Sequence, residues 1–399
     1  MQGLFSRPFN SLDENDLRDL VDVHRVREHI HLDYKEESYA HGHTGAVKML
    51  TDVTAMANAQ GGYILIGVEE DRTEPDGTPK QMVGIENGDT EATWIQSVCL
   101  SSIDEKITGL RVRDILLTNG RSCVIIQVPN SIKKPHMIVH ERHRSFRIRH
   151  GRMNSDMGMQ EVRNMILSMN TYRTSLASFI EDRKQKLRDL AEEKPWLLLM
   201  TTPIYVDRDK IDPLRDDIRD LLRRTPGLPD RRCEGIHAGI PKPTLFGIEA
   251  SHRDKKILRL FRNGHLEYCE NHSAVDYRPK EAIPIHSYQM TVTLLHFLEV
   301  ARQIMQLGEV SEPLTITAHW ENFNPSYLHP WEKKTIPFHI KDRGIFLWRE
   351  RRLSIEFTAS ELSDTNNLAR SVIDRLFNAF GYDENPHFDA DGNFEVVRS

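Results

Sequence analysis

Three carboxylates and one lysine lie near the ends of two segments whose patterns predict β-strands. The carboxylates are Glu28, Asp33 and Glu70, and the lysine is Lys35. If the two strands are neighbours in a sheet, the acids can converge, and three oxygen ligands are what a hard cation such as Mg²⁺ or Mn²⁺ requires. Such a cation activates water in phosphodiester cleavage, while a lysine can stabilise the pentavalent phosphate. The simpler alternative is chance, because the chain has 59 acidic residues among 399.

The segment 133–152 is basic within a chain that is acidic overall. It contains seven Lys and Arg residues against one acid, whereas the whole chain has a formal net charge of −6. Alternation near its end predicts a strand in which Phe146 and Ile148 point inward while Arg147 and Arg149 point outward together. This row favours contact with nucleic-acid phosphates over the alternative, a solvated edge strand protected by charge. The candidate nucleic-acid-binding residues are Lys133, Lys134, Arg144, Arg147, Arg149 and Arg152.

Other ligand-binding motifs are weak or missing from the sequence. There is no GxxxxGK[ST] segment, so we expect no P-loop nucleotide site. His41-x-His43 and His140 to His143 resemble fragments of metal sites, but no partner has zincin spacing, and the sequence favours exposed histidines. The four cysteines are scattered singly, which argues against a disulfide framework and against a thiolate zinc site.

Hydrophobic periodicity predicts the elements that must position these residues. In the first half it predicts helices over 11–28, 44–60, 91–102 and 157–193, strands over 29–36, 63–68, 81–85, 137–140 and 145–149, and a hairpin of 110–118 with 122–128 across Asn119-Gly120. After Pro195 the pattern restarts, with strands over 196–206, 257–261, 265–268, 314–320, 345–348 and 353–357 and helices over 213–224, 290–307 and 367–380.

The expected fold class is mixed α/β, with two domains. The first domain covers 1–165, a helical connector covers 166–194, and an α+β domain covers 195–399. The longest apolar stretch, 196–206, is about half the length that spans a bilayer, and the N-terminus lacks the pattern of a secretory signal. We therefore expect a cytoplasmic protein with no membrane partner.

The segment of about 25–165 resembles the Schlafen family, whose bacterial members carry an AlbA-like Schlafen domain. The resemblance is carried by LDYKE (32–36), AMANAQGGYILIGVEED (55–71), VGI (83–85) and FRIRHG (146–151), and ANAQGG followed directly by YILIGV is its specific part. It implies a mixed sheet and, in catalytically active relatives, a metal-dependent endoribonuclease acting on tRNA and related structured RNA. The acids of these relatives fall on Glu28, Asp33 and Glu70, which would hold Mg²⁺ or Mn²⁺. The family more often has Glu and Asp at the last two positions, so the side-chain lengths differ here.

The leading hypothesis is therefore a metal-dependent endoribonuclease in which Lys35 stabilises the phosphate and the basic row holds the RNA. Animal relatives pair two related lobes and one lobe is recognisable here, which implies a homodimer. By analogy with antiphage defence, we expect residues 195–399 to act as a sensor or regulatory domain that binds a protein trigger. Two alternatives stay open: a non-catalytic nucleic-acid-binding regulator, and a scaffold whose second domain binds a protein.

Overall fold

The computed structural model describes residues 4–5, 7, 9–75, 77–252, 255–272, 283–308, 310, 312–329, 347–359 and 362–396. Its contacts divide the chain into two compact units, one ending at Thr171 and the other beginning at Tyr172. The division falls inside α4 (Met159–Ala191), within the segment that we expected to be a separate connector. Within the described residues, no helix is both long and apolar enough to cross a bilayer.

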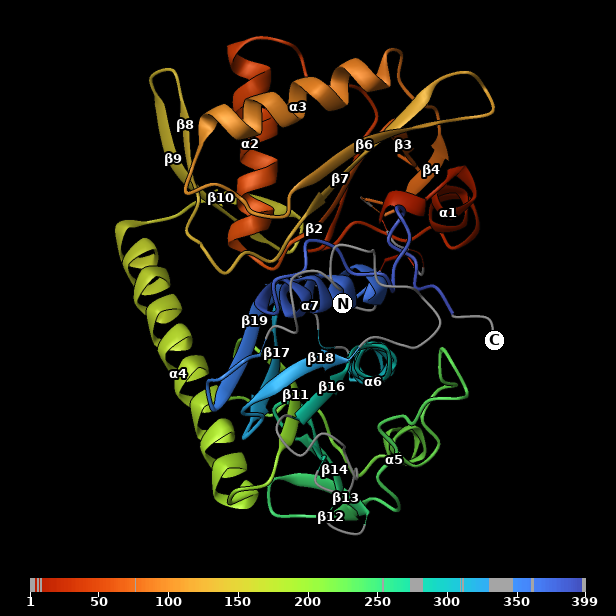
Figure 1. Ribbon diagram of the computed structural model, residues 1–399. Coiled ribbons are helices and arrows are strands. Elements are labelled where there is room, and N and C mark those ends of the chain that lie inside the picture. The colour runs from red at the N-terminus through yellow and green to blue at the C-terminus, as the bar shows by residue number, and fades with distance from the viewer. Residues whose placement is uncertain are drawn as a thin grey trace. The chain divides into compact units, whose positions relative to one another are not determined.

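A four-stranded mixed sheet in the order β1-β2-β7-β6 forms the centre of the N-terminal unit. β1 (Leu32–Lys35) is parallel to β2 (Gly62–Ile66), while β7 (Ser122–Val128) is antiparallel to both β2 and β6 (Arg111–Leu116) (Figure 1). Every residue of β2 and β7, the two central strands, is buried, so both faces of the sheet are covered at these strands. This explains why both sequences are apolar on both faces. β1 lies at the edge of the sheet.

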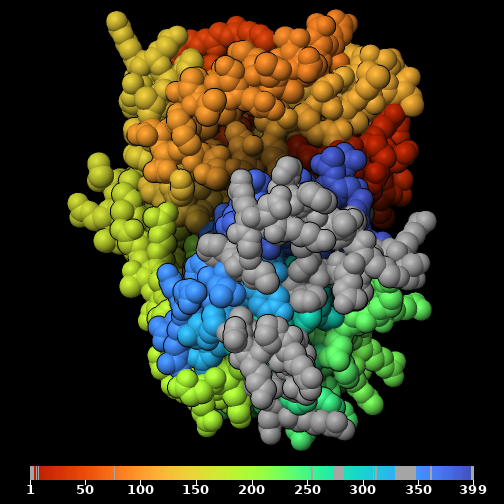
Figure 2. Space-filling model, in the orientation of Figure 1, coloured from red at the N-terminus to blue at the C-terminus, as the bar shows by residue number. Residues whose placement is uncertain are grey.

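A second sheet in the order β10-β9-β8-β5 contains the basic segment. β8 (Met137–His140) and β9 (His143–His150) form a hairpin, flanked by β10 (Met153–Asp156) and β5 (Ile103–Asp104). α2 (His43–Asn58) packs against β8, β9 and β10, while α3 (Gly88–Ser102) packs against β6 and β7. One face of α3 stays at the surface, where Figure 2 shows it in orange. The core between these elements includes Met49, Leu50, Val53, Ile64 and Ile126.

Short elements complete the N-terminal unit. A 3₁₀ turn (Phe9–Ser11) precedes α1 (Glu14–Arg18), which continues as a π-helical turn (Asp19–Val23). β3 (Val68–Glu70) pairs with β4 (Pro79–Met82). Gly61 follows α2 with a φ of 72°, and its N–H donates to the carbonyl of Met56 at 2.9 Å, so a left-handed glycine ends this helix as the sequence predicts.

The C-terminal unit is built on a seven-stranded antiparallel sheet in the order β12-β13-β14-β15-β11-β17-β19. The strands are β11 (Trp196–Pro203), β12 (Lys242–Pro243), β13 (Gly247–His252), β14 (Lys256–Phe261), β15 (Leu266–Asn271), β17 (Leu314–Glu321) and β19 (Arg352–Ala359). The remaining elements are the helices α5 (Asp216–Arg223), α6 (Ser287–Leu307) and α7 (Thr365–Ala379), and the parallel pair β16 (Ile283–His286) and β18 (Ser326–His329). α6 is almost entirely buried and supplies much of the core of this unit.

The structure confirms the predicted fold class, since helices and mixed sheets make up both units. Most predicted elements are present with ends shifted by a few residues. The first helix is shorter than predicted and stops at Val23, and the strand expected over 81–85 lies at 79–82. The first two residues of the strand predicted over 345–348 lie outside the described residues.

Candidate active site

Asp33 lies on the edge strand β1 and is buried between two cations. Its side chain is only 6 % exposed, Arg149 Nη2 lies 3.0 Å from Oδ1, and Lys35 Nζ contacts Oδ2. A buried carboxylate requires such partners because it has lost its hydration. The structure thus brings Asp33 and Lys35 together, as the sequence predicts, and adds Arg149 to them.

Asp33, Lys35 and Arg149 form a cluster. Asp52, on α2, extends this cluster on the other side of Lys35. The ammonium of Lys35 lies 3.9 Å from Asp52 Oδ2. Asp52 accepts hydrogen bonds from the hydroxyl of Tyr39 at 2.8 Å and from Nδ2 of Asn154 at 2.7 Å. Burial lowers the pKa of Lys35, but the charges of Asp52 and Asp33 outweigh it, so the net pKa is raised and the ammonium stays protonated. Burial also raises the pKa of Asp52.

Sequence reasoning did not select Asp52, Tyr39 or Asn154. One signal was present in the sequence: Asp52 comes three residues after the buried Met49, and so falls on the apolar face of α2. A carboxylate at such a position needs a partner inside the protein. The partners of Asp52 come from other elements, which no local pattern identifies.

Glu28 lies beside the same cluster. One of its carboxylate oxygens accepts the backbone N–H of Tyr34 at 2.6 Å, and its own N–H donates to the carbonyl of Gly77 at 2.8 Å. Burial and the charges of Asp33 and Glu70 raise the pKa of Glu28, although the hydrogen bond from Tyr34 opposes them. Glu28 therefore interacts electrostatically with both of the other predicted acids.

Glu70, the last residue of β3, is exposed. Its neighbours in the sequence are engaged elsewhere, since Glu69 pairs with Lys80 and Asp71 pairs with Arg25. Although the charge of Glu70 acts on Glu28, the oxygens of Glu28, Asp33 and Glu70 do not all lie within 4.8 Å of one another. The three acids therefore form a loose group and not a closed set of ligands.

The residues of this group nonetheless fit a hard divalent cation. Three carboxylates are the right donors. Burial and then repulsion by Asp33 and Glu70 raise the pKa of Glu28, and a cation would relieve this repulsion. Ion pairing does not disqualify Asp33, because each carboxylate oxygen has two lone pairs. Two buried polar atoms near Asp33 and Asp52, Arg149 Nε and Asn154 Oδ1, have no hydrogen-bond partner in the described part of the chain. The cluster therefore has capacity for a ligand or water.

Four of the six predicted basic residues lie at or near the surface of the N-terminal unit. Arg144, Arg152 and Lys133 are exposed, while Arg147 is half-buried with its guanidinium 3.1 Å from Asp156. Lys133 lies 3.6 Å from Glu105. These four side chains remain candidates for phosphate contact.

Arg149 and Lys134 are buried. The prediction that Arg149 points outward is therefore wrong, and Lys134 is not at the surface, where a contact with phosphate has to lie. Besides Asp33, the guanidinium of Arg149 donates to the carbonyls of His29 at 3.3 Å and Leu32 at 3.2 Å. Alternation along β9 predicts a solvent-facing side chain at position 149. The prediction fails because Arg149 contacts Asp33 and the outer edge of β1 instead of water. Lys134 Nζ donates to the carbonyl of Ala59 at 2.7 Å, and burial lowers the pKa of Lys134 to about 8.

The residues of the cluster also close the outer edge of β1. The N–H of Leu32 donates to the carbonyl of His29, and the carbonyl of Leu32 accepts from Arg149. The N–H of Tyr34 donates to Glu28, and the carbonyl of Tyr34 accepts from Lys35 at 3.3 Å. The N–H and carbonyl groups of Leu32 and Tyr34 therefore all have hydrogen-bond partners without a further strand beside β1.

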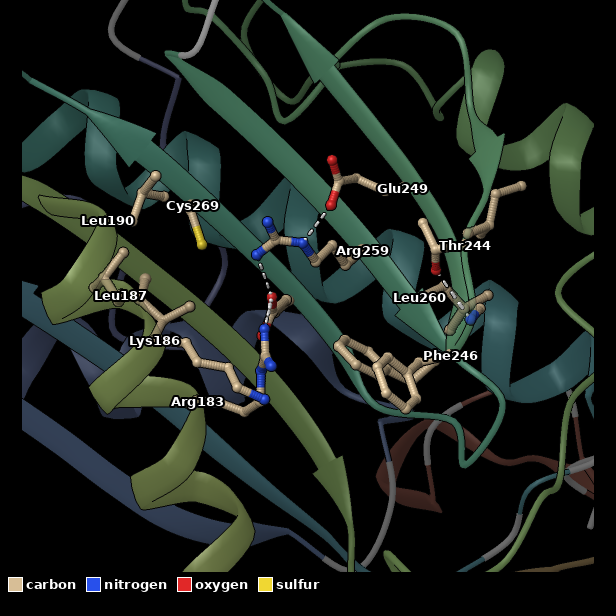
Figure 3. Close-up of a pocket in the computed structure, with 15 residues that line it drawn as sticks. Arg183, Lys186, Leu187, Leu190, Thr244, Phe246, Glu249, Arg259, Leu260 and Cys269 are labelled. Carbon is tan, nitrogen blue, oxygen red and sulfur yellow. Dashed lines mark hydrogen bonds and ion pairs between the residues drawn. The ribbon is translucent and has the colours of Figure 1, made fainter.

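The C-terminal unit contains a cavity of about 390 Å³ between α4 and the strands β13, β14 and β15. Figure 3 shows a chain of ion pairs along it: Arg183 binds Glu267 through two contacts of 2.7 and 2.8 Å, and Arg259 bridges Glu267 at 2.8 Å and Glu249 at 2.6 Å. Phe246 and Leu187 add apolar surface to the lining. The two arginines and two glutamates pair with one another, and the pair of Arg183 with Glu267 connects α4 to the sheet.

The fold and the cluster together define the N-terminal unit as a mixed α/β domain whose edge strand carries a buried group of acids and cations. Residues 28–158 match the family model described as Schlafen, AlbA_2. The N-terminal unit therefore carries a Schlafen AlbA_2 domain, as the resemblance in the sequence predicts. This domain class indicates a function related to nucleic acids.

The comparison with solved structures finds the solution NMR structure of the N-terminal domain of an ATP-dependent DNA helicase RecG-related protein from Nitrosomonas europaea. The two chains are 19% identical, the similarity covers 37% of this chain and 93% of that one, and the TM-score is 0.26. No curated protein matches the chain.

Proposed function

We propose that the N-terminal unit is a metal-dependent endoribonuclease that cleaves tRNA or related structured RNA. The observation that carries the proposal is the cluster of Glu28, Asp33 and Lys35 at the edge strand β1, with Glu70 at the end of β3, a strand that contacts β1. A protein that only binds phosphate has no need of clustered acids beside its cations, because acids repel a polyanion.

The roles of the residues follow from their charges. Glu28, Asp33 and Glu70 would hold Mg²⁺ or Mn²⁺, which when bound polarises a phosphate oxygen and activates water. Arg149 and Lys35 keep the carboxylate of Asp33 ionised and fixed in position. Lys35 is also half-buried and protonated, so it supplies positive charge where charge develops on the phosphate.

Basic side chains near the cluster support binding of an RNA backbone. A Cβ atom added at Gly77 would lie 2.7 Å from Arg152 Nη1 and 2.9 Å from Cβ of Glu28, so Arg152 reaches the neighbourhood of the acids. Arg144 and Arg147 lie on the same hairpin as Arg149. An RNA bound across this hairpin would bring its phosphates toward Asp33.

The second candidate function is that of a non-catalytic nucleic-acid-binding regulator. It is favoured by the complete ion pairing of Asp33, since a carboxylate between two cations also serves as a purely structural link. Under this alternative the basic residues would bind nucleic acid and the acids would only stabilise the fold.

The deciding experiment is incubation of the full-length protein with total tRNA in Mn²⁺, in Mg²⁺ or in chelator. We expect fragments with metal and none with chelator or with the Glu70→Gln variant. Binding of intact tRNA without fragments under every condition would instead establish the regulator.

We further propose that the protein is a cytoplasmic homodimer whose C-terminal unit receives a protein trigger, as in antiphage defence. The support is the match of residues 28–158 to one Schlafen, AlbA_2 family model, together with a second unit of comparable size. Sedimentation of the full-length protein tests the dimer directly.

A further inference from the structure

The two histidine fragments of the sequence come together in the N-terminal unit. His43 is the first residue of α2, His140 is the last residue of β8, and Glu141 begins the turn between β8 and β9. One ligand atom from each of these three side chains lies within 4.8 Å of the others. His43 Nδ1 is 2.9 Å from Glu141 Oε2. Figure 1 shows the start of α2 and the tip of this hairpin at the same end of the unit.

Surrounding contacts hold these side chains in place. Nδ1 of His140 forms a 2.9 Å hydrogen bond with the hydroxyl of Ser102, the last residue of α3. In metal sites such a bond fixes the orientation of the imidazole and leaves Nε2 to bind the ion. The rings of His43 and His140 stack with centroids 5.5 Å apart. Glu141 has a φ of 49°, so the turn holds it in a left-handed conformation that few residues of its type adopt.

The donor set selects the class of ion. Two imidazole nitrogens and one carboxylate oxygen suit Zn²⁺ and related transition metals, whereas Mg²⁺ prefers oxygen ligands. Ligands about 2.1 Å from a tetrahedral Zn²⁺ lie about 3.4 Å from one another. The 2.9 Å between His43 Nδ1 and Glu141 Oε2 therefore has to widen slightly, and the ligand atom of His140, within 4.8 Å of both, has to settle at a similar distance. His43 and Glu141 are exposed, which permits this movement and lets the ion enter.

We propose that His43, His140 and Glu141 bind a divalent transition-metal ion of the Zn²⁺ class, which fastens the tip of the β8–β9 hairpin to the start of α2. α2 carries Asp52, and β9 carries Arg149. The ion therefore ties together two elements that supply the cluster around Asp33. This site is separate in residues and in ion type from the Mg²⁺ or Mn²⁺ site proposed above, and it does not depend on the nuclease activity.

The test is isothermal titration of the full-length protein, stripped of metal by chelator, with Zn²⁺ and then with Mg²⁺. We expect one Zn²⁺ per chain at this site and no competition from millimolar Mg²⁺. His43→Asn, His140→Asn and Glu141→Gln should each weaken Zn²⁺ binding at least tenfold. Ser102→Ala should weaken it by about tenfold, the usual effect of losing a partner of a ligand.

His41→Asn is the matched control. His41 lies two residues from His43, but its ring is held by Glu91 at 2.8 Å and stacks on Trp94. We expect this variant to bind Zn²⁺ as the wild type does. Co²⁺ gives a second readout, because its visible absorption should appear with the wild type and with His41→Asn and be lost with Glu141→Gln.

Two results would overturn the proposal. One is Zn²⁺ affinity in Glu141→Gln and His140→Asn equal to that of the wild type. The other is a larger loss with His41→Asn than with His140→Asn, which would assign binding to the local His-x-His fragment. Glu141 is exposed, so its Gln variant leaves the core of the unit unchanged, and circular dichroism checks the fold directly.

Discussion

Asp33 and Glu70 differ in burial, and this difference decides which of the two gives a clean test of catalysis. Glu70→Gln should abolish metal-dependent cleavage without changing the melting temperature, because Glu70 is exposed. Asp33→Ala should abolish cleavage and also destabilise the fold by about 3 kcal/mol, because it leaves the buried guanidinium of Arg149 without its acid. Cleavage assays and thermal melts of both variants measure the two effects. Wild-type cleavage rates in both would remove these acids from the mechanism.

Glu28 offers a prediction about pH. Its folded-state pKa is raised above the usual 4.5, so between these two values the folded state binds more protons than the unfolded chain. The free energy of unfolding therefore falls as pH rises through this window, and at pH 7 the ionised side chain carries the full penalty. Glu28→Gln removes the penalty while keeping an oxygen for the N–H of Tyr34. We expect its melting temperature to exceed that of the wild type at pH 7 by on the order of 2 °C.

The Glu28→Gln gain should vanish near pH 4, where Glu28 is protonated in both states. Melting curves at pH 4 and pH 7 test the sign of the difference in melting temperature between the variant and the wild type. A lower melting temperature of the variant at pH 7 would mean that the cations of the cluster stabilise ionised Glu28 more than burial and the other acids destabilise it.

The sequence predicts part of this site and misses the rest for a physical reason. Glu28, Asp33, Lys35 and Glu70 follow from strand ends and from the family resemblance, because their positions are properties of short segments. The burial of Arg149 depends on Asp33, which is 116 positions earlier in the chain, and pairing between distant segments leaves no trace in local alternation.

At the scale of elements, the β8–β9 hairpin should dominate RNA binding. A double Arg144→Ala and Arg147→Ala variant should bind RNA more weakly for every sequence. On single-stranded RNA the slope of log affinity against log salt should become shallower by about 0.7 for each lost contact. Lys134→Met is the control, because Lys134 is buried and should leave the slope unchanged. Filter binding at several salt concentrations measures both. Equal slopes for the double variant and the wild type would show that these arginines do not contact phosphates and only form a solvated strand edge.

The loop before β4 positions Glu28 through Gly77. Gly77 has a φ of 78°, and an added Cβ would meet Arg152 and Glu28 within 3 Å. Gly77→Ala should therefore displace Glu28 and reduce cleavage. Gly120→Ala is a matched control, since Gly120 has a φ of 81° and nothing within 4 Å of an added Cβ. Both variants carry the same backbone strain, so equal cleavage by the two would show that crowding at Glu28 has no role.

Elements with strong periodicity or a clear turn were predictable, and several strands without such a signal were not. α2, α6 and the hairpin of β6 and β7 have strong periodicity or a clear turn, and the structure contains each of them. β10 and β18 have four residues each and no prediction covered them. Such strands are stabilised by pairing with a neighbour, which a four-residue pattern does not specify.

At the scale of the whole molecule, the position of the unit boundary inside α4 guides a truncation test. Ile180, Leu187 and Ala191 of α4 belong to the core of the C-terminal unit, so a fragment that keeps them would expose apolar surface. A fragment ending at Thr171 avoids this. If residues 172–399 restrain the nuclease, the fragment should cleave tRNA faster than the full-length protein and be more toxic in cells. Circular dichroism establishes that the fragment folds, and equal cleavage and toxicity would assign the C-terminal unit another role.

The closed edge of β1 has a consequence for solubility. An open edge strand is a template on which a strand of another molecule can add, and here Glu28, Lys35 and Arg149 occupy the peptide groups that such a strand would use. The side chains that form or position the proposed metal and phosphate site are therefore also the ones that keep the sheet from growing. Even in an inactive relative, substitution of one of these residues would leave a peptide group of β1 without a partner and open to pairing with another strand. The presence of these residues in a homologue would therefore not by itself indicate catalysis, because they also have this structural role.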